Sequence, residues 1–470
     1  MSKRWNYEEI RDAHFKVLLE EGKLDDKLTE IFEDFWTLSP FKQYELISYI
    51  KKHGKRPEWK VLKKVLGLSE DDTHKFLIGD PIEVKFPVVD LTGGPGKIVR
   101  GIAVKGLSKV VTNVGKEKHQ RLKKIVGSGF AVFYDTEFTG KSFQLPLAVS
   151  LMSERIPEGV LFTGELSQDG RILRANHIEE KKKIAAREGY ILVDPAKLPK
   201  PDLKSLLNWL NKDIHHIPML ITSSEKHQDE LKDFTRNLQI EDLNLELAYL
   251  ETFGIEPVLW TGQIKDQRWQ EVCKEFYSRL KHIGSVLGGF HLHIAIRGPA
   301  ALAFALGILH GSFKPFTIYH FQNNAYRPIV VDNVRYIKER LSGNPRLINY
   351  TVTGSGEEVA VVINLAHHSV QLNSLPLTNA TYLVIETQGG GNLPVENFKD
   401  IAREIAGAIQ EVAKTATIKR FHFFFSCPVP IAFLVGVAFG HYNPGSIYNY
   451  EQGTYKKVLD IEFLRDLRES

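Results

Sequence analysis

The segment GPAALAFALGILHGSFKPFTIYHFQNNAYR at residues 298–327 returns in altered form 129 residues later, as CPVPIAFLVGVAFGHYNPGSIYNYEQGTYK at residues 427–456. Nine positions between residues 299 and 326 are identical across this shift, whereas ordinary residue frequencies give about two by chance. They are Pro299/Pro428, Ala303/Ala432, Phe304/Phe433, Gly307/Gly436, Gly311/Gly440, Pro315/Pro444, Ile318/Ile447, Tyr319/Tyr448 and Tyr326/Tyr455. Such a repeat predicts two similar structural units in the C-terminal part of the chain.

Each copy reads as a strand, a proline turn, an apolar helix, a second strand and a polar loop that ends in tyrosine. The C-terminal residues around the repeat also alternate strands with helices, which is typical of α/β proteins. We therefore expect two α/β halves, at about 245–340 and 341–470, that pack as a pseudo-symmetric pair.

One stretch of the second copy, FHFFFSCPVPIAFLVGVAFG at 421–440, is apolar enough and long enough to cross a bilayer. Pro428 and Pro430 interrupt it, and its counterpart in the first copy reads as a strand followed by a helix. We interpret it as a buried strand, a turn and a buried helix, and we expect no transmembrane segment.

The N-terminal residues 1–78 have the pattern of a small helical domain. Short amphipathic helices are predicted at 6–21, 25–37, 40–53, 57–66 and 70–77. The last two have a helix–turn–helix rhythm, but the second opens with Glu70, Asp71 and Asp72, which would face DNA phosphates. Residues 1–80 carry 15 basic and 16 acidic side chains, a net charge of −1. We expect a structural or protein-docking role, and a DNA-binding regulator is the alternative.

Between residues 82 and 240 the pattern changes to that of an α+β domain. Strands are predicted in IEVKFPVVDL, IVRGIAVKG and GFAVFYDTEF, and a helix at about 142–154. A strand, a turn at Asp169–Gly170, a helix at about 178–188 and the strand YILVDP follow.

The composition indicates a folded soluble protein of several domains. The 61 basic residues nearly balance the 57 acidic ones, so broad phosphate-backbone binding has no support and no DNA partner is expected. Two cysteines, Cys273 and Cys427, form neither a disulfide framework nor a metal-ligand pair. The N-terminus lacks the apolar core of a secretory signal, so we expect a cytoplasmic protein. We also expect no metal site.

The segment TGKSFQLPLAVSL at 139–151 ends like a phosphate-binding loop, but Asp135 stands where that motif needs a glycine. A nucleophilic interpretation fits better, because a serine at a helix start can present its hydroxyl to a substrate. No histidine in this region has a companion carboxylate at a suggestive spacing, whereas a lysine that burial makes neutral can act as the base.

The stretch TGELSQDGRILRANHIEEKKKIAAREG at 163–189 resembles the Lon protease domain. The family pattern is TGE, a turn, GR-hydrophobic-L, then GG-x-x-x-K before a helix. The resemblance implies that Ser142 is the nucleophile, Lys181 the general base and Thr163 a hydroxyl that orients the lysine. Asn176-His177 replaces the family's Gly-Gly, Phe143-Gln144 replaces Ala-Gly, and the Ser–Lys interval is four residues shorter.

Three consecutive lysines, at 181–183, compete for the role of base, although only one can point at Ser142 from a helix. The ungapped interval from Thr163 selects Lys181. Ser150 and Ser153 are rival nucleophiles, but they lie inside the predicted helix. Because the chain has no complete ATP-binding motif, we expect ATP-independent, limited cleavage.

The repeated half resembles SAVED domains, which are paired CARF-like, Rossmann-like units that bind cyclic oligonucleotides. The resemblance covers roughly 245–470 and rests on FHLHIAIRGPAALAFALG with IYHFQNNAY, and on FHFFFSCPVPIAFLVG with IYNYEQGTY. In α/β sheets, ligands bind beyond the carboxyl ends of the strands. The candidate ligand-binding residues there are Arg297, Gly298, Asn323, Asn324, Tyr326, Gln388, Gly389, Gly390, Asn392, Ser426, Gln452 and Tyr455.

A Lon domain followed by SAVED resembles the CRISPR-associated Lon proteases of type III antiviral systems. This resemblance implies activation by cyclic tetra-adenylate or tri-adenylate, ligand-induced self-association, and cleavage of a dedicated partner such as a regulator inhibitor or a toxin-like protein. No cofactor is expected. The alternative is a ligand-binding sensor whose protease domain is inactive.

Overall fold

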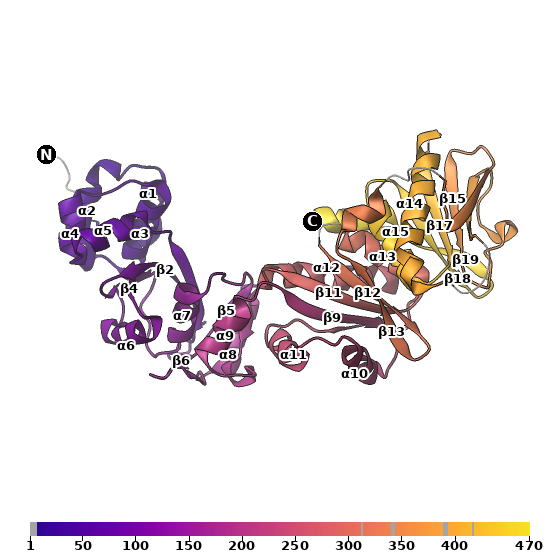
Figure 1. Ribbon diagram of the computed structural model, residues 1–470. Coiled ribbons are helices and arrows are strands. Elements are labelled where there is room, and N and C mark those ends of the chain that lie inside the picture. The colour runs from indigo at the N-terminus through magenta and orange to yellow at the C-terminus, as the bar shows by residue number, and fades with distance from the viewer. Residues whose placement is uncertain (1–6, 312–313, 340–343, 389–392, 416–417) are drawn as a thin grey trace. The chain divides into compact units, whose positions relative to one another are not determined.

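A computed structural model describes residues 7–311, 314–339, 344–388, 393–415 and 418–470 (Figure 1). The chain divides into two compact units. The first comprises Met1–Lys212, Ala248–Gly254 and Ser285–Gly288, and the second comprises Asp213–Leu247, Ile255–Gly284 and Gly289–Ser470.

The first unit begins with helices α1 (Asp12–Glu20), α2 (Leu28–Glu33), α3 (Pro40–His53), α4 (Trp59–Leu66) and α5 (Glu70–Ile78). Ser39 caps α3 by accepting the Lys42 N–H, and Ser69 caps α5 by accepting the Asp72 N–H. Gly54 and Gly67 end α3 and α4 in the left-handed conformation, at φ +68° and +60°. The breakers in the sequence therefore act where they were expected to.

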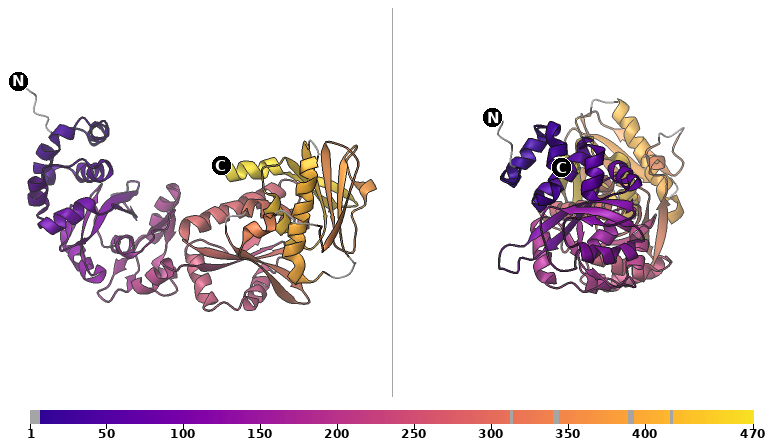
Figure 2. Two further views of the ribbon diagram at one scale, coloured as in Figure 1. Left: turned by 45° about the horizontal axis from the view of Figure 1, so that its top comes forward. Right: turned by 90° about the vertical axis from the view of Figure 1, so that its left-hand side faces the viewer.

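These helices share one hydrophobic core with a four-stranded sheet of order β1-β2-β4-β3. Its strands are β1 (Ile82–Val88), β2 (Lys97–Leu107), β3 (Val111–Thr112) and β4 (Gly129–Tyr134). The rings of Phe35 and Phe76 pack against Phe133 of β4, with centroids 5.4 and 6.5 Å away. Figures 1 and 2 show the helices, in indigo, gathered against this sheet. The boundary predicted between residues 78 and 82 separates helices from strands, but both lie in one hydrophobic core.

The rest of the first unit supplies the candidate catalytic residues. It contains α6 (Lys116–Val126), α7 (Gln144–Met152), β5 (Val160–Phe162), β6 (Glu165–Leu166), β7 (Ile172–Leu173), α8 (Ile178–Arg187), β8 (Ile191–Val193) and α9 (Leu203–Leu210). The hairpin of β6 and β7 turns at Asp169–Gly170, where Gly170 has φ +83°. Burial on all sides explains why α7 is apolar almost throughout.

The second unit starts earlier than the sequence predicts. Strand β9 (His215–Thr222) lies inside the range 82–240, yet it pairs in parallel with β11 (Phe290–Arg297) and β10 (Val258–Trp260). With β12 (Phe316–Gln322) and β13 (Ala325–Val331) these strands form one sheet, of order β10-β9-β11-β12-β13. The boundaries at 240 and 245 are thus wrong, because the partner of β9 is distant in sequence and local patterns do not register such pairing.

The second sheet of this unit has the order β14-β16-β15-β17-β18-β19. Its strands are β14 (Ile348–Thr353), β15 (Glu358–Asn364), β16 (Thr381–Thr387), β17 (Arg420–Ser426), β18 (Gly445–Glu451) and β19 (Thr454–Asp460). The helices of the unit are α10 (His227–Asn237), α11 (Leu243–Thr252), α12 (Arg268–Val286), α13 (Ala300–His310), α14 (Phe398–Thr415), α15 (Val429–Phe439) and α16 (Ile461–Glu469); Ala248–Thr252 of α11 belong to the first unit.

The structure confirms the internal repeat. Adding 129 to the bounds of α13, β12 and β13 gives the bounds of α15, β18 and β19 without a shift. The correspondence also reaches upstream, since α12 at 268–286 maps onto α14 at 398–415 within one residue. Each half of the second unit is therefore one copy of the same α/β arrangement.

The two copies pack through α13 and α15, at equivalent glycines. A Cβ atom on Gly307 would lie 2.1 Å from the Phe433 carbonyl oxygen, and one on Gly436 would lie 2.1 Å from that of Phe304. Since these four residues form two equivalent pairs across the repeat, the contact is reciprocal. This confirms the expected pseudo-symmetric packing.

The apolar stretch 421–440 folds as strand β17 followed by the buried helix α15, as the repeat predicts. Across the part of the chain that the structure describes, no helix combines the length and the apolar character needed to cross a membrane.

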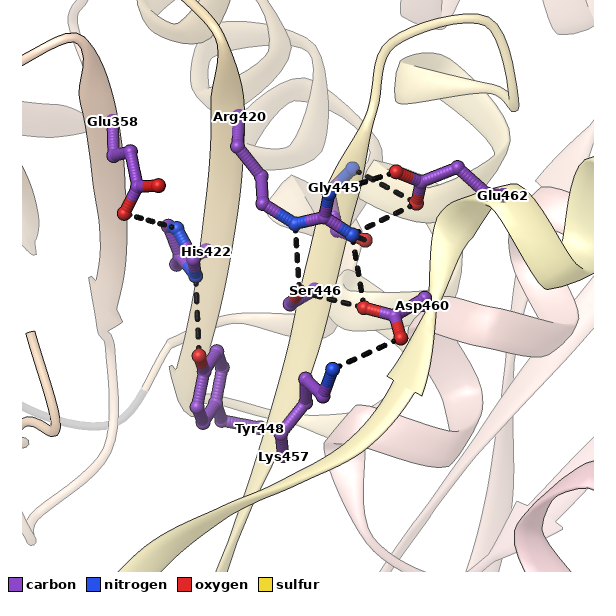
Figure 3. A network of polar contacts seen from close by, with 9 residues as sticks. All are labelled: Glu358, Arg420, His422, Gly445, Ser446, Tyr448, Lys457, Asp460 and Glu462. Carbon is purple, nitrogen blue, oxygen red and sulfur yellow. Dashed lines mark hydrogen bonds and ion pairs between the residues drawn. The ribbon is translucent and has the colours of Figure 1, made fainter.

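The amino ends of the strands in the second sheet carry a polar network, which Figure 3 shows. Arg420 pairs with Asp460 and Glu462 at 2.9 and 2.8 Å and donates to Ser446 at 3.0 Å. Beside it, His422 contacts Glu358 and the Tyr448 hydroxyl, both at 3.2 Å. All of these residues lie at the sheet edge opposite the candidate ligand-binding residues of this half.

The first sheet has the same contacts made from different residues. His291 meets the Thr317 hydroxyl and His293 meets the Tyr319 hydroxyl, each at 2.9 Å, at positions equivalent to Arg420–Ser446 and His422–Tyr448. His216 takes the place of Glu358 and lies 2.9 Å from His293. Histidines thus stand in the first half where the second half has an arginine and a glutamate.

Candidate functional site

Ser142 lies in the turn that leads into α7, and a second segment of the chain holds that turn. The Gly164 N–H donates to the Ser142 carbonyl at 2.9 Å, and the Leu145 N–H donates to the Gly164 carbonyl at 3.0 Å. Lys141 pairs with Glu165 at 2.6 Å across the same junction. Residues 141–145 and 163–165 are therefore joined along their length, which brings Thr163 close to Ser142.

Lys181, in the first turns of α8, completes the group. Its Nζ lies 2.9 Å from the Ser142 hydroxyl oxygen and 3.1 Å from that of Thr163. Lys181 is only 5% exposed and Thr163 is fully buried. The structure thus brings together the three residues that the sequence singles out for catalysis, at distances suited to proton transfer.

Burial lowers the pKa of the Lys181 amine from 10.5 to about 8, because the charged form loses hydration. Within the described residues, the hydrogen bonds of this amine go to two hydroxyls and to no carboxylate. A shift of this size means that burial destabilises the charged amine, relative to the amine in water, by about 3 kcal/mol. A neutral lysine beside a serine hydroxyl can remove its proton.

The neighbouring lysines lie in different surroundings. Lys182 pairs with Glu179 at 2.8 Å and with Asp194 at 3.1 Å, and the hydrogen bonds to these two carboxylates raise its pKa. Lys183 is exposed. Of the rival serines, Ser153 donates to the Arg155 carbonyl at 2.5 Å and Ser150 lies within α7. Of these lysines and serines, Lys181 and Ser142 are the two that meet.

An open cleft of about 280 Å³ reaches Ser142 and Lys181. One wall is apolar and consists of Phe86, Val88, Val89, Leu91 and Phe138, while Lys141, Glu165, Arg174, Asn176 and His177 supply polar groups. The cleft therefore gives access from solvent to the serine hydroxyl.

The two residues after Ser142, which depart from the Lon pattern, have defined structural roles. Phe143 is buried, stacks on His119 with centroids 4.3 Å apart, and lies 5.4 Å from the Phe138 ring. The Gln144 side chain accepts the Leu166 N–H at 3.0 Å. Both side chains therefore anchor the turn that carries the serine.

His177, the second residue of the pair that replaces Gly-Gly, has a left-handed backbone at φ 57° and ψ 41°. Glycine adopts this conformation without strain, whereas other residues do so at a cost. The backbone here therefore has a conformation that favours glycine, although the residue is a cleft-lining histidine.

The sensor candidates of the first half gather at the carboxyl edge of its sheet. Arg297 ends β11 and pairs with Glu230 of α10 at 2.5 Å, and its guanidinium lies over the Phe321 ring at 4.1 Å. Gly298 follows it and precedes α13. Asn323 and Asn324 form the tight β12–β13 turn, with φ of 52° and 58°.

In the second half, the candidate residues at the equivalent edge are neutral. Ser426 ends β17, and its hydroxyl donates to the His368 carbonyl. Gln452 and Gly453 form the β18–β19 turn, with φ of 52° and 89°. Gln388 follows β16 and is exposed. The remaining candidates Gly389, Gly390 and Asn392 lie outside the described residues.

Two of the predicted ligand contacts need correction. Tyr326 and Tyr455, expected to stack on bases, are 5% and 9% exposed, and each packs in a hydrophobic cluster of its own sheet. Successive side chains of a strand point to opposite faces of the sheet, and these two tyrosines point to the buried face. Phe321 and Tyr450, in the same two hairpins, are exposed at 41% and 58%, and the 129-residue shift makes them equivalent too. The repeat could have identified these two positions, since both are aromatic.

Comparison with known families gives one match. Residues 336–461 match the SAVED family, described as "SMODS-associated and fused to various effectors sensor domain". The part of the chain that is similar to SAVED domains therefore lies in the second unit. No curated protein matches the chain in sequence.

Several solved structures are similar to parts of the chain. The Acinetobacter baumannii Cap4 SAVED/CARF-domain containing receptor with the cyclic trinucleotide 2′3′3′-cAAA is 17% identical, with a TM-score of 0.36, over 53% of this chain and 51% of that one. The Moraxella osloensis Cap4 SAVED/CARF-domain containing receptor is 14% identical, also with a TM-score of 0.36, over 81% of this chain and 94% of that one. The chain spans about half the length of the first of these structures.

Proposed function

We propose that the chain is a protease of the Ser–Lys type whose activity is controlled by a cyclic oligonucleotide bound to its SAVED domain. The observation that carries the proposal is the contact of 2.9 Å between a buried lysine amine and the Ser142 hydroxyl, at the end of an open cleft. A buried lysine without a carboxylate partner costs folding free energy, so a catalytic role explains its presence.

In the proposed reaction, Lys181 takes the hydroxyl proton as Ser142 attacks a peptide carbonyl, and an acyl-enzyme forms with release of the amine product. The Thr163 hydroxyl accepts a hydrogen bond from the Lys181 amine and orients it toward Ser142. The Gln144 and Leu145 N–H groups already donate to the Lys141 and Gly164 carbonyls, so the N–H groups of Ser142 and Phe143 are the donors that we propose for the oxyanion. Water then attacks the ester and regenerates the serine.

For the sensor, the proposed ligand is a cyclic oligoadenylate, tetra-adenylate first and tri-adenylate second. Arg297, which pairs with Glu230 in this structure, and the amino ends of α13 and α15 are the groups that we propose for phosphates, and the exposed rings of Phe321 and Tyr450 offer stacking surfaces to bases. Binding would change self-association and release cleavage of a partner protein, within an antiviral system of the type III CRISPR kind.

The experiment combines binding with cleavage. Titration calorimetry with cyclic tri- and tetra-adenylate gives the preferred ring, and cleavage of candidate partner proteins is then followed with and without it. We expect Ser142→Ala and Lys181→Ala to lower the cleavage rate at least about a thousandfold, with ligand binding intact. Lys183→Ala, which changes the exposed lysine two residues after Lys181, is the control and should keep the activity.

Absence of cleavage under every condition, with tight ligand binding, would favour the alternative of a sensor with an inactive protease domain. Cleavage that survives either alanine substitution would contradict the dyad. A salt-dependent and sequence-selective gel shift would support the DNA-binding alternative instead.

A further inference from the structure

A second groove of the first unit, of about 390 Å³, contains none of the residues of the catalytic cleft. Three segments that are distant in sequence form it: the end of α4, the loop before β3 with the start of α6, and the short turn that carries Trp36. Its lining residues are Trp36, Val65, Leu66, Gly67, Lys109, Val110, Val111, Thr112 and Lys116.

Trp36 forms an exposed but ordered wall of this groove. Its side chain is 47% exposed, yet its indole N–H donates to the Val65 carbonyl at 2.7 Å. The Phe35 ring packs edge-on against it at 5.1 Å. The indole plane is therefore fixed before any partner arrives, so docking against it costs little side-chain entropy.

The charge of the groove has one sign. Lys109 and Lys116 supply the charged groups of the lining, and among the described residues that line the groove none is acidic. Lys109 donates to the Gly67 carbonyl, a neutral partner that leaves its charge uncompensated there. Helix α6, which begins at Lys116, adds Lys118, Arg121, Lys123 and Lys124 against one acid, Glu117. A complementary ligand is negatively charged.

We propose that this groove docks an extended segment of a partner protein in which an apolar anchor residue stands next to carboxylates. The aliphatic floor of Val65, Leu66, Val110 and Val111 suits an apolar side chain, and the two lysines suit the carboxylates. A nucleic acid is less suited, because the aliphatic floor would then lie against charged phosphates and not against an apolar side chain. The assignment gives residues 7–78 a role in partner recognition, and it does not depend on the proposed protease activity.

Fluorescence anisotropy on the full chain tests the proposal with three probes. The first is a short fluorescein-labelled peptide with a leucine–tryptophan pair beside a run of glutamates, and the second has glutamines in place of the glutamates. The third is a labelled single-stranded oligodeoxynucleotide. We expect saturable binding of the first peptide, weaker binding of the glutamine peptide, and affinity that falls with salt.

Matched variants locate the binding. Trp36→Ala should weaken the acidic peptide at least about tenfold and Lys116→Glu about threefold or more. The controls Trp59→Ala and Lys60→Glu change an exposed tryptophan and an exposed lysine of α4 outside the lining, and should stay within about twofold. Thermal unfolding of each variant verifies that it is folded.

The proposal is overturned if the acidic peptide does not bind saturably, or if folded Trp36→Ala and Lys116→Glu bind it as the wild type does. Tighter binding of the oligodeoxynucleotide than of the peptide, lost in the same two variants, would assign the groove to nucleic acid and equally reject it.

Discussion

At the residue scale, burial of the Lys181 amine affects both its pKa and the stability of the folded state. Its amine is taken from water, so the pKa falls to about 8, and the same desolvation disfavours the folded state while the amine is charged. Because the folded pKa lies below the unfolded one, this destabilisation is present at neutral pH and is relieved as the pH rises through 8 toward 10.5. Activity and stability should therefore rise together in that range.

The first prediction concerns the pH dependence of cleavage. The neutral fraction of an amine with a pKa of about 8 grows from roughly one tenth at pH 7 to roughly nine tenths at pH 9. We expect kcat/KM to rise about tenfold over this interval, with one apparent pKa near 8. Initial rates on a fluorogenic peptide measure this, and a profile that is flat between pH 7 and 9 would contradict a lysine base.

A second prediction concerns His177, whose φ of 57° favours glycine. His177→Gly should leave the free energy of unfolding unchanged or raise it by up to about 1 kcal/mol. His177→Val should lower it by about 1–2 kcal/mol, because a β-branched residue is strained there. Urea unfolding of both variants measures the difference, and equal effects of the two substitutions would show that this backbone is not strained.

At the scale of elements, the sequence predicts a large part of the fold. The repeat from Pro299 onward predicts α13, α15 and their strands, because strong apolar periodicity and proline turns are local signals. The pairing of β9 with β11 could not be predicted in this way, since it joins residues about 75 apart whose match depends on the assembled sheet. The orientation of Tyr326 could not be predicted either, because the register of β13 decides which face it occupies.

For the catalytic candidates, too, the sequence predicts some contacts and not others. The interval from Thr163 to Lys181 predicts which lysine meets Ser142, and the structure places that lysine 2.9 Å away. The role of Phe143 depends on rings from β1, β4 and α6, which lie up to 57 residues away in sequence. Such a cluster has no short-range sequence signature.

The reciprocal glycines of α13 and α15 give a third prediction. Gly307→Ala places a methyl group against the Phe433 carbonyl and should destabilise the second unit by about 1–3 kcal/mol. Gly284→Ala in α12 is a matched control, since a Cβ there meets nothing within 4 Å, and it should stabilise by up to about 1 kcal/mol. Thermal unfolding compares the two, and a neutral Gly307→Ala would contradict the close crossing of the helices.

A fourth prediction concerns the histidines at the amino edge of the first sheet. Burial, with His291 and His216 nearby, lowers the pKa of His293 to about 3. The unfolded chain therefore takes up a proton first, so stability is complete above about pH 6.5 and declines as the pH falls below it. We expect a loss of up to about 1.4 kcal/mol per pH unit from this group.

The second half lacks this triple cluster, because Glu358 and Arg420 replace two of the histidines (Figure 3). His293→Gln should therefore reduce the acid sensitivity of unfolding, measured by urea titration between pH 7 and 5. An unchanged slope of stability against pH would show that His293 does not remain neutral in the folded state.

At the scale of the whole molecule, the two units carry different parts of one proposed activity. The first holds the hydroxyl–amine pair and the groove at Trp36, and the second holds a duplicated fold in which the equivalent positions Arg297 and Ser426 are charged in one copy and neutral in the other. A ligand that binds the second unit can regulate the first only if it favours one state of the whole chain. The central claim still concerns a single pair of side chains.

The most direct measurement is covalent labelling of the serine. The chain is incubated with a serine-reactive peptidyl inhibitor, with and without cyclic tetra-adenylate, and the adduct is located by mass spectrometry of its peptides. The account predicts one adduct, on Ser142, that is faster at pH 9 than at pH 7, is lost in Lys181→Ala and is retained in Lys183→Ala. An adduct on another residue, or undiminished labelling of Ser142 in Lys181→Ala, would contradict it.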